Sequence, residues 1–173
     1  MADLTGIVLA AGAGERAGGP KALVPGWLKH SVAVLRPCAR VVVVLGAGAD
    51  IAPVPPGAQT VVADDWAQGM SASLRAGLAA ATGEAAVLTL VDLPGMPAAV
   101  VERVLADPVH AGTLRRAVFA GRPGHPVVIG RDHWEAAAAS ATGDRGAGRY
   151  LREHGAETVE CGDLWDGADV DAP

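Results

Sequence analysis

One stretch near the start of the chain decides the fold, because it joins a buried strand to a loop rich in glycine. It reads Thr5-Gly6-Ile7-Val8-Leu9-Ala10-Ala11-Gly12-Ala13-Gly14-Glu15-Arg16-Ala17-Gly18-Gly19-Pro20-Lys21. The run Thr5–Ala10 is apolar on both faces, and a strand of this kind belongs to a largely parallel sheet with helices on both sides. The glycines that follow, with Arg16 and Lys21, form a loop whose amides can approach phosphate oxygens while two cations offset their charge. The stretch therefore predicts an α/β fold with an anion-binding loop after its first strand.

Apolar runs and helical stretches alternate along the rest of the chain. The predicted strands are Thr5–Ala10, Arg40–Leu45, Gln59–Val62, Ala85–Val91, Arg116–Ala120, Val127–Ile129 and Glu157–Cys161. The predicted helices are Trp27–Leu35, Met70–Ala81, Pro97–Ala106, Arg131–Ser140 and Gly146–His154. Proline or glycine gives a stop signal at most of the helix ends. The pattern predicts one domain over residues 1–173, a Rossmann-like three-layer α/β fold with a mostly parallel central sheet.

The amino-acid composition limits the classes of molecule that the protein is expected to bind. Half of the chain is hydrophobic and 19% is charged, which excludes a disordered chain. Only 3% of the residues are aromatic, so the chain has no aromatic platform for stacking single-stranded nucleic acid. The net charge of −5 disfavours polyanions and anionic membranes, since both select for a basic patch. The composition favours small ligands, with no nucleic acid and no membrane partner.

The cysteines and the apolar runs indicate the cellular compartment in which the protein is expected. Cys38 and Cys161 lie far apart, without the spacing of a metal or redox motif. No basic segment followed by an apolar one opens the chain. The longest apolar runs, such as Val41–Leu45, are well below the roughly 18 residues of a transmembrane span. We therefore expect a cytoplasmic protein without a disulfide framework.

Three nucleotide-binding motifs compete for the glycine-rich loop, and the first is a dinucleotide fingerprint. The spacing Gly12-x-Gly14-x-x-Ala17 satisfies a loose form of it. That motif requires a helix starting in the loop and an acidic residue about 20 positions onward, at the end of the second strand. The run Gly18-Gly19-Pro20 would break the helix, and Asp50 comes too late. The loop therefore disfavours dinucleotide binding.

The second motif is a Walker A loop. The sequence does not match it, because Pro20 precedes Lys21 and Ala22 stands where Ser or Thr should hold Mg²⁺.

The third motif fits the loop. The segment Leu9–Lys21 resembles the signature of the nucleotidyltransferases related to MobA, the molybdenum cofactor nucleotidyltransferases, with Ala17 in place of the usual Met. The resemblance implies that Arg16 and Lys21 are catalytic residues that bind the triphosphate. It also implies nucleotide-binding roles for Leu9, Ala10, Ala11, Gly12, Gly14 and Lys21.

A second block, Asp64–Leu78, resembles the D-W/Y-A-x-G-M-x-x-S-L-x-x-G-L segment of the same family. In those relatives the segment lies beside the nucleotide base, and Ala63 stands where many of them carry Asn. The resemblance implies nucleotide-binding roles for Asp64, Gly69, Met70, Ser71 and Ser73. A glycine permits close approach of the backbone, and the two serines bring hydroxyls to a helix start. Plain helix capping is the alternative role for the serines.

Two carboxylates are candidate metal ligands. Asp92 emerges from the apolar run Leu88–Val91, where a lone carboxylate is costly unless it binds a cation or a donor. The resemblance implies that Asp92 is catalytic and binds Mg²⁺, and that Asp171, in the segment Asp169–Pro173, approaches the same ion. The alternatives are a strand-end turn for Asp92 and a solvated acidic tail for Asp171.

Two further elements, Gly121–Val127 and Thr142–Ala147, resemble the MocA-type branch of the family, the cytidylyltransferases. The resemblance implies that His125 and Asp144 border the acceptor pocket. The run Gly124-His125-Pro126 predicts an imidazole fixed in a rigid turn. The alternatives are a turn histidine satisfied by the backbone, and an Asp144 that caps the last helix.

The resemblance implies the three-layer nucleotidyltransferase fold and a transfer reaction. In this reaction a phosphate on a small acceptor, such as the molybdenum (molybdopterin) cofactor, would attack the α-phosphorus of an NTP, and pyrophosphate would leave. The resemblance favours CTP as the NTP and implies Mg²⁺ as the cofactor. The segment Lys21–Trp27 is shorter than in the family. Three alternatives remain: an NAD(P)- or flavin-binding Rossmann-type oxidoreductase, a catalytically weak nucleotide- or cofactor-binding module, and a sugar-phosphate nucleotidyltransferase.

Overall fold

A seven-stranded sheet organises the chain in the computed structural model, which describes residues 2–15 and 18–171. The strand order is β3-β2-β1-β4-β6-β5-β7. The strands are β1 (Leu4–Ala10), β2 (Arg40–Leu45), β3 (Gln59–Val62), β4 (Ala85–Leu90), β5 (Leu114–Phe119), β6 (Arg122–Gly130) and β7 (Glu157–Glu160). Only β6 runs against its neighbours β4 and β5, and the other pairs are parallel. The mostly parallel Rossmann-like sheet predicted from the sequence is confirmed.

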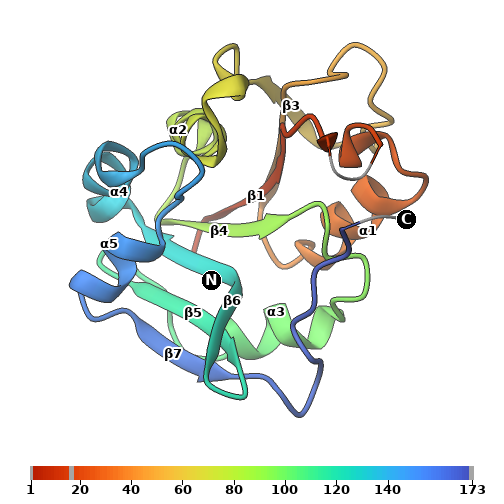
Figure 1. Cartoon of the computed structure of the whole chain (residues 1–173). Helices are drawn as coiled ribbons and strands as arrows, with labels where there is room; N and C mark the ends of the chain where they lie inside the picture. Colours follow the sequence, from red (N-terminus) through yellow and green to blue (C-terminus); the bar gives the residue numbers. More distant parts are fainter. Residues whose placement is uncertain (1, 16–17, 172–173) are drawn as a thin grey trace.

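Helices cover both faces of the sheet (Figure 1). They are α1 (Trp27–Val34), α2 (Met70–Ala80), α3 (Ala98–Val104), α4 (Trp134–Ser140) and α5 (Gly148–Glu153), with short 3₁₀ segments η2 (Lys21–Leu23), η3 (Trp66–Gln68) and η4 (Arg131–His133). Every residue of β1 is buried, and alternate side chains enter different core clusters. Val8 packs in the cluster that includes α1 and α3, whereas Ile7 and Leu9 pack in the cluster that includes α2, α4 and α5. This explains why the strand is apolar on both faces.

The hairpin between β5 and β6 differs from the prediction. The sequence predicted a turn around His125, but His125 lies within β6, so that prediction is wrong. The chain reverses earlier, where Ala120 and Gly121 both have positive φ angles of 50° and 75°. Two consecutive residues of this kind make a tight hairpin turn, which pairs Phe119 with Arg122 and extends both strands.

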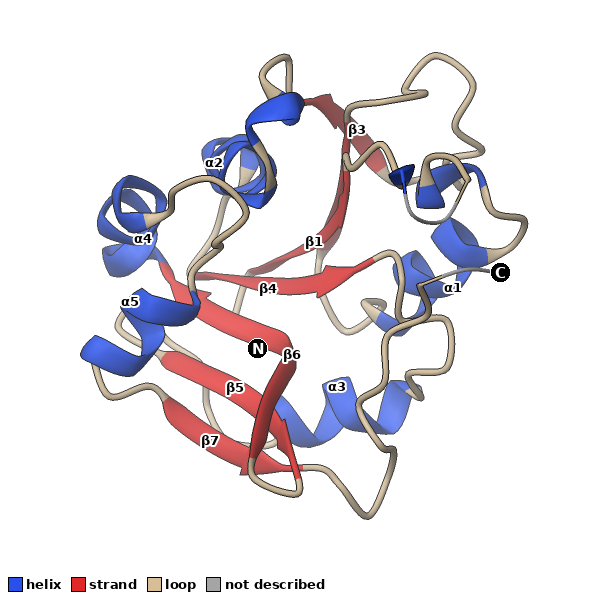
Figure 2. Cartoon of the chain, viewed as in Figure 1, coloured by secondary structure: helices blue, strands red, loops and turns tan. Residues whose placement is uncertain are grey.

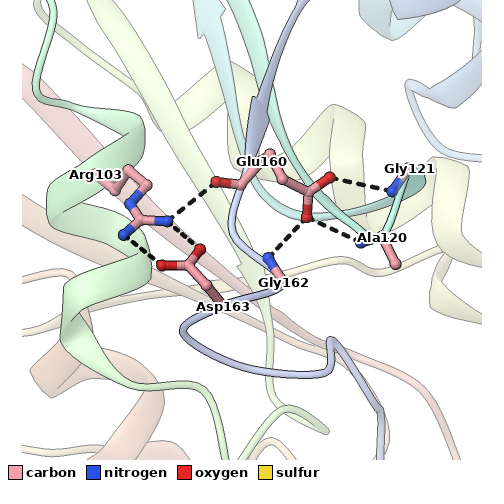
Figure 3. A network of polar contacts seen from close by, with 6 residues as sticks. All are labelled: Arg103, Ala120, Gly121, Glu160, Gly162 and Asp163. Carbon is pink, nitrogen blue, oxygen red and sulfur yellow. Dashed lines mark hydrogen bonds and ion pairs between the residues drawn. The ribbon is translucent and has the colours of Figure 1, made fainter.

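A polar network fixes the edge of the sheet (Figure 3). The Glu160 carboxylate accepts hydrogen bonds from the backbone N–H groups of Ala120, Gly121 and Gly162 at 2.8 to 3.1 Å. These bonds hold the pKa of Glu160 below its usual range. Arg103 on α3 pairs with Asp163 and donates to the Glu160 carbonyl oxygen. The network therefore ties the end of β7 to the hairpin and to α3.

After β7 the chain runs back toward the end of β4 (Figure 2). There the backbone N–H of Val170 donates to the carbonyl oxygen of Asp92 at 2.9 Å. This return places a late segment of the chain beside the carboxyl end of a central strand.

Over the described ranges, no helix combines the length and the apolar character that crossing a membrane requires.

Candidate functional site

A cavity of about 510 Å³ opens at the carboxyl ends of β1 and β4. Ligands bind at this edge in open α/β sheets. The lining residues come from the glycine-rich loop, η3, the start of α2, the end of β4 and two loops: Leu9, Ala10, Ala11, Gly12, Ala13, Gly14, Glu15, Lys21, Trp66, Ala67, Gly69, Met70, Ser73, Leu90, Val91, Asp92, Asp144 and Asp171. Most candidate residues from the sequence therefore meet in one place.

The glycine-rich loop closes on itself before Pro20. The N–H of Gly19 donates to the carbonyl oxygen of Gly14 at 3.1 Å. Gly14 has a φ of 62°, and a Cβ there would overlap the Gly19 carbonyl group. The short η2 follows at Lys21, and the first α-helix begins at Trp27. No α-helix starts in the described part of this loop, so the geometry departs from the dinucleotide fingerprint.

The neighbouring loops bring Trp66 into the cavity wall. The N–H of Ala47 donates to the carbonyl oxygen of Ala11 at 3.2 Å. A Cβ at Gly46 would lie only 2.5 Å from the Trp66 side chain, so glycine permits this close approach. Trp66 was not among the site residues predicted from the sequence. The signal was present, because this is the aromatic residue of the Asp-Trp-Ala-x-Gly-Met motif.

The start of α2 packs against the loop that carries Asp144. The N–H of Ser71 donates to the Gly143 carbonyl oxygen at 2.9 Å. Gly69 has a φ of 102°, and a Cβ there would overlap the Asp144 carboxylate. Asp144 therefore lies at the cavity wall, and the helix α5 has no side-chain cap, so Asp144 does not cap it.

The predicted residues of the second block separate into two groups. Gly69, Met70 and Ser73 line the cavity. Ser71 is buried outside the lining, and Asp64 is exposed. The nucleotide-binding roles of Asp64 and Ser71 remain predictions.

An ion pair lies in the cavity between the loop and the end of β4. The Lys21 Nζ is 2.9 Å from Asp92 Oδ2 and 3.7 Å from Asp171 Oδ1. The side chains of Lys21 and Asp92 are each 18% exposed. The other oxygen of Asp92, Oδ1, is buried and has no hydrogen-bond partner among the residues that the structure describes. The arrangement brings two carboxylates to one cation and leaves a buried anionic oxygen unsatisfied.

This pair of carboxylates fits a hard divalent cation, which prefers oxygen ligands. The described residues contain no group of three or more Asp, Glu, His or Cys side chains that could hold a metal ion by themselves. An ion at Asp92 and Asp171 would therefore share its coordination with ligand phosphates and water. Arg16, the other predicted triphosphate residue, lies outside the described residues.

A second cavity of about 230 Å³ adjoins the first. Leu9, Met70, Leu90 and Asp144 line both cavities. His125 from β6 lines the second cavity, and burial, with a smaller contribution from Arg116, lowers the pKa of its imidazole from 6.5 to about 4. The imidazole is therefore neutral at neutral pH.

Arg116 from β5 also lines this cavity, and it was not among the site residues predicted from the sequence. The pair Arg115-Arg116 was a usable signal, because adjacent residues of a strand point to opposite faces of the sheet. One of the two arginines had to face α2, α4 and α5.

The fold and this edge of the sheet define a class, the α/β proteins that bind a nucleoside triphosphate beside a glycine-rich loop. The chain belongs to the family of MobA-like NTP transferase domains, whose model matches residues 6–159. This match confirms the resemblance indicated by the sequence motifs and assigns the chain to a nucleotidyltransferase family.

The relatives agree over nearly the whole chain. It is 38% identical over 189 residues to the nicotine blue oxidoreductase of Paenarthrobacter nicotinovorans, covering 97% of this chain and 92% of that protein. The homologue of Mycobacterium tuberculosis rv0371c from Mycobacterium sp. strain JC1 is 32% identical with a TM-score of 0.83, covering 98% of this chain and 91% of that one. Rv0371C of M. tuberculosis H37Rv, solved as a complex with manganese, is 25% identical with a TM-score of 0.72, covering 99% and 91%.

Proposed function

We propose that this protein transfers a nucleotidyl group from an NTP, with CTP favoured, to a phosphate on a small acceptor such as the molybdenum (molybdopterin) cofactor. The observation that carries the proposal is the Lys21–Asp92 pair, with its unsatisfied carboxylate oxygen, facing the glycine-rich loop in a cavity of about 510 Å³. The adjoining second cavity offers room for an acceptor next to the nucleotide.

In the proposed reaction an oxygen of the acceptor phosphate attacks the α-phosphorus of the NTP. The bond between the α-phosphorus and its bridging oxygen to the β-phosphate breaks, and pyrophosphate leaves with the electron pair. Phosphoryl-type transfer requires positioning and charge stabilisation rather than a nucleophilic side chain. The loop amides and Lys21 would hold the triphosphate and offset the charge that develops on the leaving group. Arg16 is proposed to share this role.

The proposal includes a divalent cation, Mg²⁺. Asp92 and Asp171 would hold it, and the buried unpartnered Oδ1 of Asp92 is the feature that fits such a ligand. When bound, the ion would neutralise phosphate oxygens and polarise the phosphorus. The manganese complex of the related Rv0371C supports a divalent cation here.

The choice of CTP and of a molybdopterin acceptor is supported by sequence resemblance. The elements around His125 and Asp144 resemble the MocA-type cytidylyltransferases, and both residues line the second cavity. A sugar-phosphate acceptor remains the alternative, and it would bind in the same second cavity.

The name of the Paenarthrobacter relative raises the oxidoreductase alternative for this chain. The loop geometry disfavours it, because the described part of the loop turns back at Gly14 and Gly19 instead of starting an α-helix, and β2 ends without an acidic residue for a ribose. A binding module without catalysis would share the cavity but would release no pyrophosphate.

The test is thermal unfolding of the whole chain with Mg²⁺ and, in parallel, CTP, GTP, ATP or NADP⁺, followed by a pyrophosphate-release assay with candidate acceptors. A ligand at 100 times its Kd stabilises the native state by about 2.7 kcal/mol. Lys21→Ala should lose the NTP-dependent rise in Tm, whereas Lys29→Ala, which removes an exposed lysine of α1, should retain it. Stabilisation by NADP⁺ alone would contradict the proposal. An NTP-dependent rise without pyrophosphate release with any candidate acceptor would favour the binding module.

A further inference from the structure

The second cavity contains a cation that the proposed transfer reaction does not use. The Arg116 guanidinium lies on its wall, and its Nε is buried without a hydrogen-bond partner among the described residues. Within the same part of the chain, its side chain makes one hydrogen bond, a long one from Nη2 to the Gly124 carbonyl oxygen at 3.4 Å. Among the described residues no carboxylate lies within ion-pair distance of it. The residue as a whole is half-buried, but a buried guanidinium nitrogen without an acceptor is unfavourable unless a ligand supplies one.

The adjacent Arg115 shows how this fold satisfies an arginine that has a structural role. Arg115 faces the other side of the sheet, where its Nε donates to Glu157 at 2.6 Å. Its Nη1 donates to the carbonyl oxygens of Val104 and Asp107 at 2.9 and 3.1 Å. Of these two neighbouring arginines, Arg115 has a carboxylate and several carbonyl partners, whereas Arg116 has one long bond to a carbonyl among the described residues and keeps donors for a ligand.

The surroundings of Arg116 define the ligand. Buried leucine and valine side chains form much of the wall, namely Leu74, Leu88, Val127 and Leu151. Burial and the positive charge of Arg152 both act on the guanidinium and lower its pKa. The carboxylate of this cavity, Asp144, belongs to the residues shared with the first cavity and is not within ion-pair distance of Arg116. An apolar wall, a neutral His125 and this unpaired guanidinium together suit an acceptor with a largely apolar body that brings one anionic group besides its attacking phosphate.

The position of Arg116 indicates which end of the acceptor carries the anionic group. The four residues shared by the two cavities mark the junction, where an acceptor must present its attacking phosphate to the nucleotide. Arg116 and His125 line the second cavity and are not among the four residues that it shares with the first. We therefore take a group that reaches Arg116 to be a second group of the acceptor, at the end opposite its attacking phosphate.

We propose that Arg116 determines acceptor specificity by binding an anionic oxygen group at the end of an apolar acceptor opposite its attacking phosphate. This inference rests on the proposed function, since that function makes the second cavity an acceptor site. The guanidinium can donate two parallel hydrogen bonds to such a group, which a lysine cannot reproduce.

The test uses the full chain and two flat probes of the same shape, 2-naphthoate and its neutral analogue 2-naphthamide, measured by calorimetric titration. Wild-type protein should bind the carboxylate about tenfold or more tightly than the amide, because only the carboxylate pairs with the guanidinium. Arg116→Gln should lose that difference, and Arg116→Lys should retain part of it. Arg149→Gln, which removes an exposed arginine of α5, is the matched control and should bind as wild type does.

Equal binding of the two probes to wild type, an unchanged preference in Arg116→Gln, or no binding of naphthoate at millimolar concentration would each overturn the inference. If Arg116→Gln does not fold, as judged by circular dichroism, the Arg116→Lys comparison decides in its place. The Lys21→Ala variant separates this inference from the proposed function. It should bind naphthoate normally while losing NTP-dependent stabilisation. A chain that binds naphthoate through Arg116 but is not stabilised by any NTP would contradict the proposed function alone.

Discussion

The two adjoining cavities are built in different ways. Backbone from the glycine-rich loop and one ion pair, Lys21–Asp92, make up much of the first. Side chains from strands and helices line the second, which is mostly apolar around Arg116 and His125. A site made of backbone depends on the path of the chain and suits a ligand common to a family. A site made of side chains changes with single substitutions, so we expect the second cavity to carry what is specific to this protein.

The largest expected effect concerns the charge in the first cavity. Asp92→Asn keeps the shape of the side chain but removes the anion that faces Lys21 and the proposed cation. We expect pyrophosphate release to fall about a hundredfold or more and to lose its dependence on Mg²⁺. The exposed Asp169 provides the control, because Asp169→Asn changes a carboxylate of the same late segment. Full Mg²⁺-stimulated activity in Asp92→Asn would remove this residue from the mechanism.

The next effect tests whether the first cavity depends on the path of its backbone. Gly14→Ala should lower the free energy of unfolding by about 3 kcal/mol or more, because its φ is 62° and the added Cβ would overlap the Gly19 carbonyl. Gly12→Ala is the matched substitution in the same loop, where an added Cβ meets no atom of the described residues within 4 Å. Denaturant unfolding of both variants measures the difference. Similar stability of the two would show that the loop adapts easily, and the contrast between the cavities would weaken.

A smaller expected effect, on the pH dependence of stability, tests whether the second cavity excludes water from His125. The pKa of His125 is lowered from 6.5 to about 4 in the folded chain, so between these pH values the unfolded chain binds the extra proton. Stability therefore falls as the pH decreases from 6.5 to 4, by on the order of 1–3 kcal/mol. His125→Gln should flatten this part of the pH profile, measured as Tm against pH. A profile identical to wild type would mean that the imidazole is solvated, which would contradict a dry second cavity.

The fold and the first cavity were largely predictable because their signals are local in the sequence. Lys21 follows the glycine-rich loop and Asp92 follows a buried strand, and parallel strands bring their carboxyl ends to one edge. His125 was assigned to a turn because Gly124 and Pro126 favour turns. The hairpin instead reverses at Ala120 and Gly121, which adopt the positive φ angles.

The second cavity was harder to predict because its chemistry depends on tertiary partners. Arg115 and Arg116 are identical in type and adjacent in sequence, and only the packing on each face decides which of them finds carbonyl and carboxylate partners. The buried Nε of Arg116 and the apolar side chains around it come from elements that are far apart in the sequence. Partner-dependent features of this kind require the three-dimensional arrangement.

The return of the chain after β7 has a consequence for how the protein reaches its competent state. Asp171 lies beside Lys21, and the neighbouring Val170 N–H donates to the Asp92 carbonyl oxygen, so the late segment reaches the site from far along the sequence. Contacts between residues so distant in sequence close large loops, and their entropic cost favours formation late in folding. A chain whose central strands have already assembled would then lack one of the two carboxylates proposed to hold the cation, and we expect cation affinity to appear as one of the last kinetic steps of folding.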